Sequence, residues 1–348
     1  MPITIKDIAK LANVSTATVS FVLNNSSKVS EETRKRVLEI IKETGYTPNI
    51  FARGLVSSKT NTIAVIVPFI SHVFGDRYFG EGISGIYDTA KKYNYKIMLE
   101  QASYEFAATK KYLELFKEHS IDGMLYLGST INDTYLIDFA GRDYPFILVN
   151  SYLPNIDISA VYADNITTGY KAMEYFYNSG HRRIAFIYGS MNVTGTIDQY
   201  VGIKKFFEEK NLTLSGHYVV SGDFTEEGGY KGTLTLLENE NLPTAIFCGN
   251  DLMAIGCIKA LKENKIRVPQ DIAVMGCDNI KIAEYTEPKL STFKMDIYEI
   301  ASLACEKLIQ QIENKTNELI KIILPMEMII RESTDTKINQ IDEISKVG

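Results

Sequence analysis

Tryptophan is absent from this chain of 348 residues, and cysteine and histidine occur only four times each. The cysteines have no CxxC spacing, which excludes a disulfide framework and indicates reduced core thiols of a cytoplasmic protein. The histidines are dispersed, none has a second ligand at metal spacing, and no nucleophile–base set accompanies them. We therefore expect no metal site, no cofactor and no catalytic residue among Cys248, Cys257, Cys277, Cys305, His72, His119, His181 and His217.

Long hydrophobic runs are also missing. The N-terminus has no apolar core of a signal peptide, and no segment approaches the length of a membrane span. These absences predict a cytoplasmic protein without a membrane partner.

Basic charge is concentrated at the start of the chain. Residues 1–60 hold nine basic and five acidic side chains, whereas residues 61–348 hold 28 basic and 38 acidic ones. A basic head on an acidic body fits a small nucleic-acid-binding domain attached to a body that does not bind nucleic acid.

Residues 4–23 predict two short helices around a tight turn. Thr4 can cap the first helix, with Asp7 facing its exposed N–H groups. Ser15 can cap the second, whose first turn from Thr16 to Thr18 is small and polar. Such a helix suits the DNA major groove, and an ordinary helical hairpin is the alternative.

A third helix and a short fourth one complete the head. Ser30 can cap a helix over 31–44, which Gly45 ends. Thr47 and Pro48 start a hinge helix of about nine residues, shorter than the roughly 12–15 residues needed for marginal stability in isolation. We expect it to be ordered only against a partner or DNA. The predicted domains are therefore a helix-turn-helix head over 1–45 and a hinge with linker over 46–60.

These motifs resemble the lactose-repressor (LacI/GalR) family of transcription regulators. IKDIA, NVSTATVS, VLNN, KVSEETRKRV, GYTPN and ARGL cover nearly all of residues 3–56, in the order and at the spacing of that family. The resemblance implies that Thr16 and Ala17 face base edges and that Leu55 of two paired hinge helices wedges into the minor groove. It implies further DNA contacts, mostly to phosphates, by Thr4, Ser15, Thr18, Ser20, Asn24, Ser30, Tyr46, Asn49 and Ala52.

Phe21 departs from the family pattern, which usually has an arginine after ATVS. A bidentate arginine–guanine contact contributes about 1–3 kcal/mol of discrimination. Phe21 can contact a thymine methyl group instead, or simply pack, so we expect an unusual half-site.

From residue 61 onward, short β-branched runs alternate with amphipathic helices. This alternation predicts parallel sheets covered by helices on both faces, in two sets of about four strands either side of 152–165. A ligand cleft is expected where the carboxyl ends of the strands meet. The expected strands are 62–68, 96–100, 123–129, 146–151, 183–189, 218–221, 244–249 and 272–277, and the helices include 106–119, 166–179, 196–210 and 251–264.

The resemblance implies how these elements divide into two doubly wound subdomains of a periplasmic-binding-protein-like core. The chain would cross back near Leu290, so that 61–162 plus 290–320 form one subdomain and 163–289 plus 321–333 the other. Residues 334–348 are expected to be a loose tail.

Polar residues at strand ends suggest an effector site. Asp164 follows VYA just before a predicted helix, and Asn250 and Asp278 follow predicted strands. Each of the three can be an ordinary helix cap. Together they resemble the family's effector-binding positions, with Phe224 as the aromatic that covers the ligand and Phe79 on the opposite wall. Carboxylates beside an aromatic face suit a sugar.

Gln199 is the second departure, because sugar-binding members usually have an arginine at this place in the R-x-x-G motif. Glutamine still forms hydrogen bonds but has no charge and no guanidinium fork. A different polyol, an unusual or weakly bound sugar, and a protein co-effector as in the catabolite-control branch remain alternatives.

Two further interpretations compete with a regulator. Gly80, Gly82 and Gly85 spell GxGxxG, with Glu100 ending a later strand, as in a dinucleotide-binding enzyme. However, eleven residues separate these glycines from the first strand, and the segment has the pattern of a helix. A sugar-binding protein of the transport type would leave the head unexplained. We favour a homodimeric repressor that binds pseudo-palindromic operator DNA and is not an enzyme.

Overall fold

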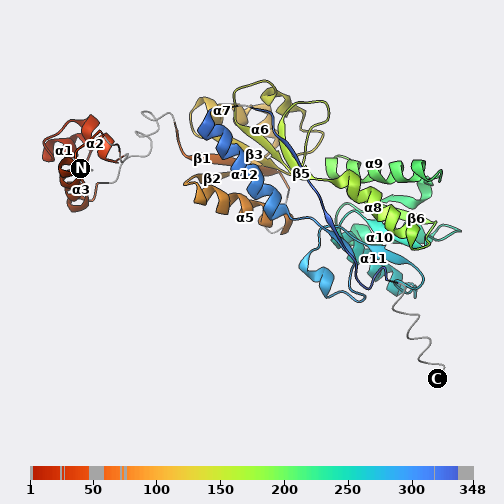
Figure 1. The fold of residues 1–348 in the computed structure, drawn as a ribbon. Helices are drawn as coiled ribbons and strands as arrows, with labels where there is room; N and C mark the ends of the chain where they lie inside the picture. Colours follow the sequence, from red (N-terminus) through yellow and green to blue (C-terminus); the bar gives the residue numbers. More distant parts are fainter. Residues whose placement is uncertain are drawn as a thin grey trace. The chain divides into compact units, whose positions relative to one another are not determined.

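The computed structural model describes residues 3–23, 26, 28–46, 59–70, 73, 77–316 and 318–335. It divides into two compact units, of which the first contains residues 1–60 and the second nearly all of the remainder (Figure 1). The predicted hinge helix lies outside the described residues, and so do Asn24, Asn49, Ala52 and Leu55.

The head has the three predicted helices, α1 (Ile5–Leu11), α2 (Thr16–Leu23) and α3 (Glu31–Thr44). They enclose a small core that includes Ile8, Val19 and Val37, each fully buried. The helices form where the sequence places apolar residues at helical spacing, and this shared core holds them together.

The expected caps of the head are confirmed. Ser15 Oγ accepts from the Thr18 N–H at 3.1 Å, and Ser30 Oγ accepts from the Thr33 N–H at 3.4 Å. At α1, Thr4 and Asp7 form the expected pair, since the Thr4 hydroxyl and N–H both donate to Asp7, at 2.7 and 2.9 Å. Gly45 has φ 63°, the left-handed conformation that ends α3.

The core contains two parallel sheets and a small antiparallel one. The first sheet has the strand order β11-β5-β4-β3-β1-β2, the second has β7-β6-β8-β9, and β10 pairs with β12. The strand bounds are β1 (Thr62–Pro68), β2 (Lys96–Ala102), β3 (Gly123–Leu127), β4 (Phe146–Val149), β5 (Ser159–Ala163), β6 (Ile184–Tyr188), β7 (Val219–Ser221), β8 (Ala245–Cys248), β9 (Ala273–Met275), β10 (Thr292–Lys294), β11 (Lys321–Leu324) and β12 (Glu327–Ile329).

Helices alternate with these strands, as the sequence predicts for parallel sheets. The α-helices are α5 (Arg77–Lys92), α6 (Tyr104–Ala108), α7 (Lys111–Lys117), α8 (Asn165–Asn178), α9 (Thr194–Glu209), α10 (Glu226–Leu237), α11 (Asp251–Glu263) and α12 (Ile297–Asn314). Short 3-10 helices are η2 (Thr134–Phe139), η3 (Gly216–Tyr218) and η4 (Lys281–Glu284). The helix expected over 106–119 is instead split into α6 and α7, because Lys110 adopts φ 55° between them.

The second sheet has the expected four strands, but the first has six where about four were expected. β5 was not predicted, and it pairs in parallel with β4, while β11 pairs in parallel with β5. Lys321–Leu324 therefore belongs to the first sheet, although the family resemblance placed it in the second subdomain. Local patterns do not show which distant strand supplies the partner, and this pairing joins segments about 160 residues apart.

The chain crosses between the two subdomains three times: after β5, between β10 and α12, and between β11 and β12. The second crossing comes later than expected. Leu290 is still buried in the hydrophobic cluster of the second sheet, and the backbone of Ser291 forms an isolated parallel β-bridge with Met275. Thr334, expected at the start of the loose tail, is instead 2% exposed and hydrogen-bonds to Ser291. The tail beyond residue 335 lies outside the described residues.

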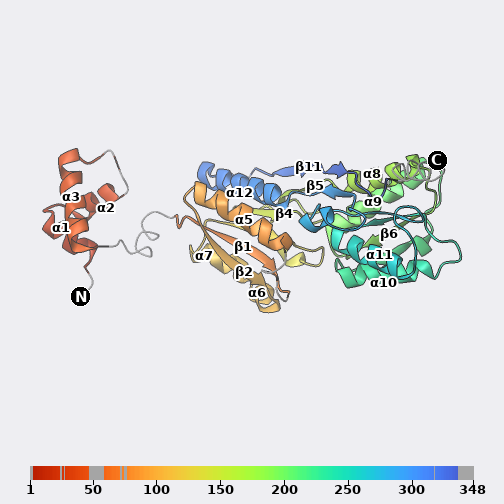
Figure 2. The ribbon, with the colours of Figure 1, turned by 90° about the horizontal axis from the view of Figure 1, so that it is seen from below.

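Glycines allow three helix pairs of the core to approach closely. A Cβ at Gly85 of α5 would collide with the Tyr298 carbonyl oxygen of α12, and Gly202 of α9 likewise meets Ile166 of α8. Gly256 of α11 meets Glu226 of α10 in the same way. Figures 1 and 2 show these pairs side by side. The GxGxxG segment lies within α5, where Gly85 serves helix packing.

We expect Gly85→Ala to destabilise the core by about 1–3 kcal/mol, because the new methyl group forces α5 away from α12. Gly80 of the same helix is the matched control, since a Cβ added there would meet nothing within 4 Å. Gly80→Ala should stabilise by about 0.5–1 kcal/mol through helix propensity. Urea unfolding measures both, and equal effects would contradict the packing account.

Candidate nucleic-acid interface and ligand site

Helix α2 presents one accessible face outside the head's core, on which small side chains lie beside Phe21. Ser15, Thr16 and Ala17 are exposed, whereas Val19 and Val22 are buried. Thr18 and Ser20 are half-buried, and Phe21 is 38% exposed. The structure therefore places the α2 residues predicted to contact DNA on or beside one accessible surface.

The predicted phosphate contacts outside α2 also have structural roles. Thr4 and Ser30 stand at the N-termini of α1 and α3, where unpaired backbone N–H groups favour anions. Hydrogen bonds from Thr4 hold the pKa of the Asp7 carboxyl below its usual value. Tyr46 is half-buried against the head's core, and its N–H donates to the Ile41 carbonyl.

Four of the six predicted effector residues belong to a chain of contacts that runs from the end of β5 to the strand ends of the second subdomain. Asp164 Oδ1 accepts from the Thr167 N–H as the cap of α8, and Asn250 Oδ1 accepts from the Met253 N–H as the cap of α11. The Asn250 side-chain amide donates to the Phe224 carbonyl at 3.0 Å. Asp164 and Asn250 therefore have the ordinary capping role, and their effector-binding role stays a prediction.

The Gln199 side chain lies between the segments that carry the caps of α8 and α11. It is 4% exposed, and its Nε2 donates to Asn165 Oδ1 and to the Gly249 carbonyl, both at 3.3 Å. The uncharged amide therefore braces the start of α8 against the end of β8. Asp164 is next to Asn165 in the sequence, and Asn250 is next to Gly249. Through these two bonds Gln199 therefore positions the backbone at Asp164 and Asn250.

The two predicted aromatic walls occupy equivalent places in the two subdomains. The Phe79 ring lies against Gly128, just after β3, and the Phe224 ring lies against Gly189, just after β6. Phe224 has φ 66°, a conformation uncommon for a residue with a side chain, which turns it back over β6. Phe79 therefore stands with the first sheet. Asp164 stands at the first crossing, directly after β5, where its N–H donates to the Leu324 carbonyl of β11, and the other four predicted effector residues stand with the second subdomain.

Asp278 lies at the end of the second sheet, with φ 112°, and its N–H donates to the Phe293 carbonyl. Its backbone forms an isolated parallel β-bridge with Lys294 at the second crossing. Asp278 therefore lies beside the second crossing between the subdomains.

Two hydrogen bonds that the sequence did not predict join the subdomains directly. The Ile131 N–H donates to the Asn192 carbonyl at 2.9 Å, and the Tyr152 hydroxyl donates to Asp198 Oδ1 at 2.7 Å. Asp198 is 5% exposed, and burial raises the pKa of its carboxyl while the tyrosine bond opposes this. Neither pairing has a local sequence signal, because the partners are 61 and 46 residues apart.

Asp251 is a buried carboxylate beside the second crossing. Its Oδ1 accepts from the Thr292 hydroxyl at 2.6 Å, and its Oδ2 accepts from the Ile280 N–H at 2.8 Å. Burial raises the pKa of this carboxyl to about 7, although both hydrogen bonds and Arg331 oppose the rise. Asp251 thereby ties α11 to β10 and to the loop after β9.

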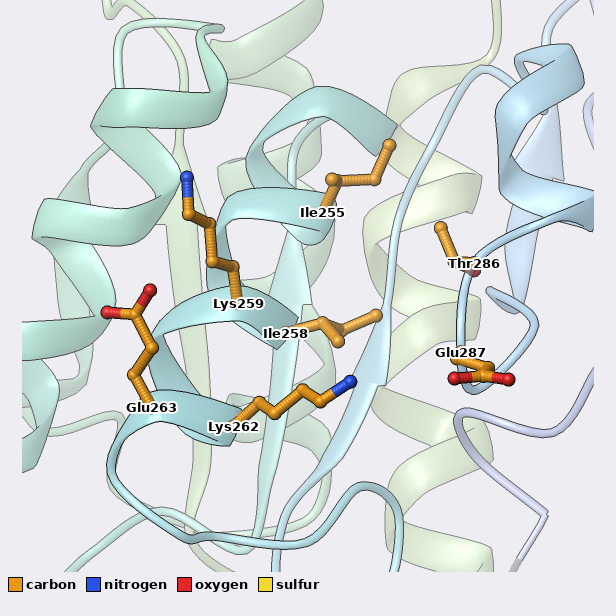
Figure 3. Close-up of a pocket in the computed structure, with 7 residues that line it drawn as sticks. All are labelled: Ile255, Ile258, Lys259, Lys262, Glu263, Thr286 and Glu287. Carbon is orange, nitrogen blue, oxygen red and sulfur yellow. The ribbon is translucent and has the colours of Figure 1, made fainter.

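Two cavities lie elsewhere than the predicted ligand site. One of about 260 Å³ is lined by α11 and the loop after η4, including Ile255, Ile258 and Thr286 (Figure 3). The other, of about 180 Å³, lies where the three crossings meet and is lined by Ala163, Met295 and Met326 among others. None of the six predicted effector residues lines either cavity.

In the described part of the chain, no cluster of three or more histidine, cysteine or acidic side chains could hold a metal ion. Nor does any described helix combine the length and apolarity needed to cross a membrane.

Comparisons with known proteins agree with this architecture. A model for "Bacterial regulatory proteins, lacI family" matches residues 4–49, and one for a "Periplasmic binding protein-like domain" matches residues 173–334. The chain is 34% identical over 331 residues to the HTH-type transcriptional repressor CytR of Escherichia coli (strain K12), covering 95% of this chain and 96% of that protein.

Two solved structures share the fold. The transcriptional regulator CelR–cellobiose complex is 27% identical, covers 95% of this chain and 99% of that chain, and has a TM-score of 0.71. The lac repressor dimer bound to operator and the anti-inducer ONPF is 23% identical, covers 96% and 99%, and has a TM-score of 0.83.

The three-helix head and the two-sheet core define a DNA-binding transcription regulator with a periplasmic-binding-protein-like body. The chain belongs to the lacI family of bacterial regulatory proteins. Its relatives are named regulators and repressors rather than enzymes.

We expect the Asp251 carboxyl to make folding pH-dependent. Its pKa is near 3.8 when unfolded and about 7 when folded, so the folded protein holds an extra proton between these values. The stabilisation from this group is therefore present at low pH and is lost as pH rises towards 7. The urea-unfolding free energy of Asp251→Asn should fall less between pH 5 and 7 than that of the wild type. An identical slope would contradict the raised pKa.

Proposed function

We propose that this protein is a homodimeric repressor that binds a pseudo-palindromic operator in the cytoplasm and is controlled by a small sugar-like effector. The observation that carries the proposal is the exposed face of α2. Val19 and Val22, on the other side of the helix, are buried and anchor it to the head's core. A helix that is anchored on one side and accessible on the other suits the major groove.

In this proposal Thr16 and Ala17 face base edges, because they stand exposed in the first turn of α2. Ser15, Thr18 and the caps of α1 and α3 meet phosphates, which fix the register of the head without reading sequence. Ser20 and Tyr46, together with Asn24, Asn49, Ala52 and Leu55 outside the described residues, remain predictions from the sequence.

We expect Thr16→Asp to weaken operator binding by about 10- to 100-fold, the size of one lost base contact, with phosphate repulsion added. An aspartate in the first turn suits the helix dipole, so α2 should stay folded. Selection from a random duplex library first supplies the operator, and fluorescence anisotropy then measures the affinity. Thr16→Ser, which keeps the hydroxyl, is the control and should bind nearly as the wild type does. Unchanged affinity of Thr16→Asp would contradict the assigned face.

We propose that the second copy docks on the face formed by α11 and η4. Leu252, Ile282 and Tyr285 are 42%, 53% and 72% exposed there. They accompany the 260 Å³ groove of Figure 3, whose apolar floor includes Ile255 and Ile258. The groove's rim is charged with both signs, by Lys259, Lys262, Glu263 and Glu287.

Mixed charge favours a second copy over a different partner. A two-fold interface brings one patch against itself, so the patch must carry both signs to be self-complementary. The two lysines of α11 can then face the glutamates of the other copy while the exposed apolar side chains are covered.

We expect Ile282→Asp to convert the dimer to a monomer, because it places a charge in the apolar part of this face. Ile137 of η2 is similarly exposed, at 57%, so Ile137→Asp is the matched control and should remain dimeric. Sedimentation velocity distinguishes the two states. A dimeric Ile282→Asp would place the interface elsewhere.

The effector is proposed to bind at the strand ends near Asp164, Gln199, Phe224, Asn250 and Asp278, with Phe79 from the first subdomain. Two of these six residues are acidic and none is basic. A neutral polyol therefore fits better than a phosphorylated sugar or a carboxylate, which these groups would repel. The structural likeness to the CelR–cellobiose complex supports a sugar.

Effector binding is proposed to change the relative orientation of the two subdomains. The contacts Ile131–Asn192 and Tyr152–Asp198 hold one arrangement, and a ligand that prefers another must break them. In this proposal, the reorientation changes the spacing of the two paired heads and thereby the affinity for the operator.

A further inference from the structure

A lysine of the α2–α3 loop lies over the exposed ring of Phe21. Lys28 Nζ is 5.5 Å from the ring centroid, within the range of cation–π attraction. Phe21 is 38% exposed and is not among the described residues that form the head's core. A large apolar ring is thus kept at the surface on the helix that presents Thr16 and Ala17.

Ser26 fixes this arrangement. Its N–H donates to the Phe21 carbonyl at 2.9 Å, and its hydroxyl oxygen accepts from the Lys28 N–H at 3.3 Å. Its carbonyl accepts from Arg34 Nη2 at 2.6 Å, and the Arg34 guanidinium pairs with Glu31 on the same helix. The loop is therefore tied to both α2 and α3, which places the Lys28 backbone beside the end of α2.

The chemistry of the major groove limits what such a ring can read. Base edges there present hydrogen-bond donors and acceptors, and thymine adds one apolar feature, its 5-methyl group. A phenyl ring forms no strong hydrogen bond with the polar edges, so the thymine methyl is its matching target.

We propose that Phe21 and Lys28 form one specificity-determining unit, in which the ring contacts the 5-methyl group of a thymine and the ammonium group pairs with a nearby phosphate. This inference rests on the proposed operator binding. Phe21 supplies the discrimination, and Lys28 positions the ring and adds sequence-independent attraction.

Replacing thymine with uracil removes only the methyl group, so it tests the contact directly. The full-length protein is titrated with selected operator duplexes that carry uracil at one symmetric pair of positions at a time. We expect one pair at which the wild type loses about fourfold in affinity per half-site, the effect of one buried methyl group. Phe21→Ala should bind the thymine and uracil operators equally at that pair.

Leu38→Ala is the control for removal of an exposed apolar side chain from the same head. Leu38 lies on α3 and is 47% exposed. This variant should keep the full thymine preference, and circular dichroism checks that both alanine variants are folded.

Lys28→Met separates the role of the charge, because it keeps a chain of similar length. We expect weaker binding to every duplex, a salt dependence reduced by about one phosphate contact per head, and a smaller thymine–uracil ratio. Lys28→Arg should restore the ratio. A purely structural lysine would lower folding stability without changing that ratio.

The outcomes separate this inference from the proposed function. Specific operator binding with no uracil-sensitive position, or with one that Phe21→Ala preserves, overturns the thymine contact and leaves the repressor proposal intact. A thymine–uracil ratio that Lys28→Met leaves unchanged overturns the shared unit. Absence of any sequence-specific binding overturns both.

Discussion

The core depends on three crossings of the chain between two parallel sheets. They follow β5, β10 and β11, and the second is anchored by the buried Asp251, which accepts hydrogen bonds from Thr292 and Ile280. Each subdomain keeps its own hydrogen-bonded sheet, so one can rotate against the other about the crossings without losing a strand. Under the proposed effector control, the dihedral freedom of a few connecting residues would set the movement available to the protein.

The close packing of helices makes each of the two subdomains rigid. Glycine contacts such as Gly85–Tyr298 and Gly202–Ile166 bring the backbones of paired helices together, which leaves little room for the helices to slide. Under the proposed effector control, a ligand at the strand ends would shift whole subdomains rather than single side chains. The direct bonds from Tyr152 to Asp198 and from Ile131 to Asn192 are among the contacts that such a shift would break.

Sequence reasoning succeeded where the determinants are local. Ser15 and Ser30 cap their helices and Gly45 ends α3, because capping depends on residues a few positions apart. It failed where distant segments meet: β5 is short, and its partner β11 comes about 160 residues later. Gln199 was recognised as unusual, but its bonds to Asn165 and Gly249 come from the packing of α8, α9 and β8. The family assignment was predicted from the head motifs and is confirmed. The predicted effector and DNA contacts stay predictions.

The central claim is that a ligand in the core and DNA on the head influence each other. Calorimetric titration of the full-length protein with a panel of neutral sugars, with and without its selected operator duplex, tests this most directly. The account predicts that at least one sugar binds, and that the operator changes its Kd by the same factor by which the sugar changes the Kd for the operator. A bound sugar whose affinity is the same with and without operator, or no binding by any neutral sugar, would contradict it.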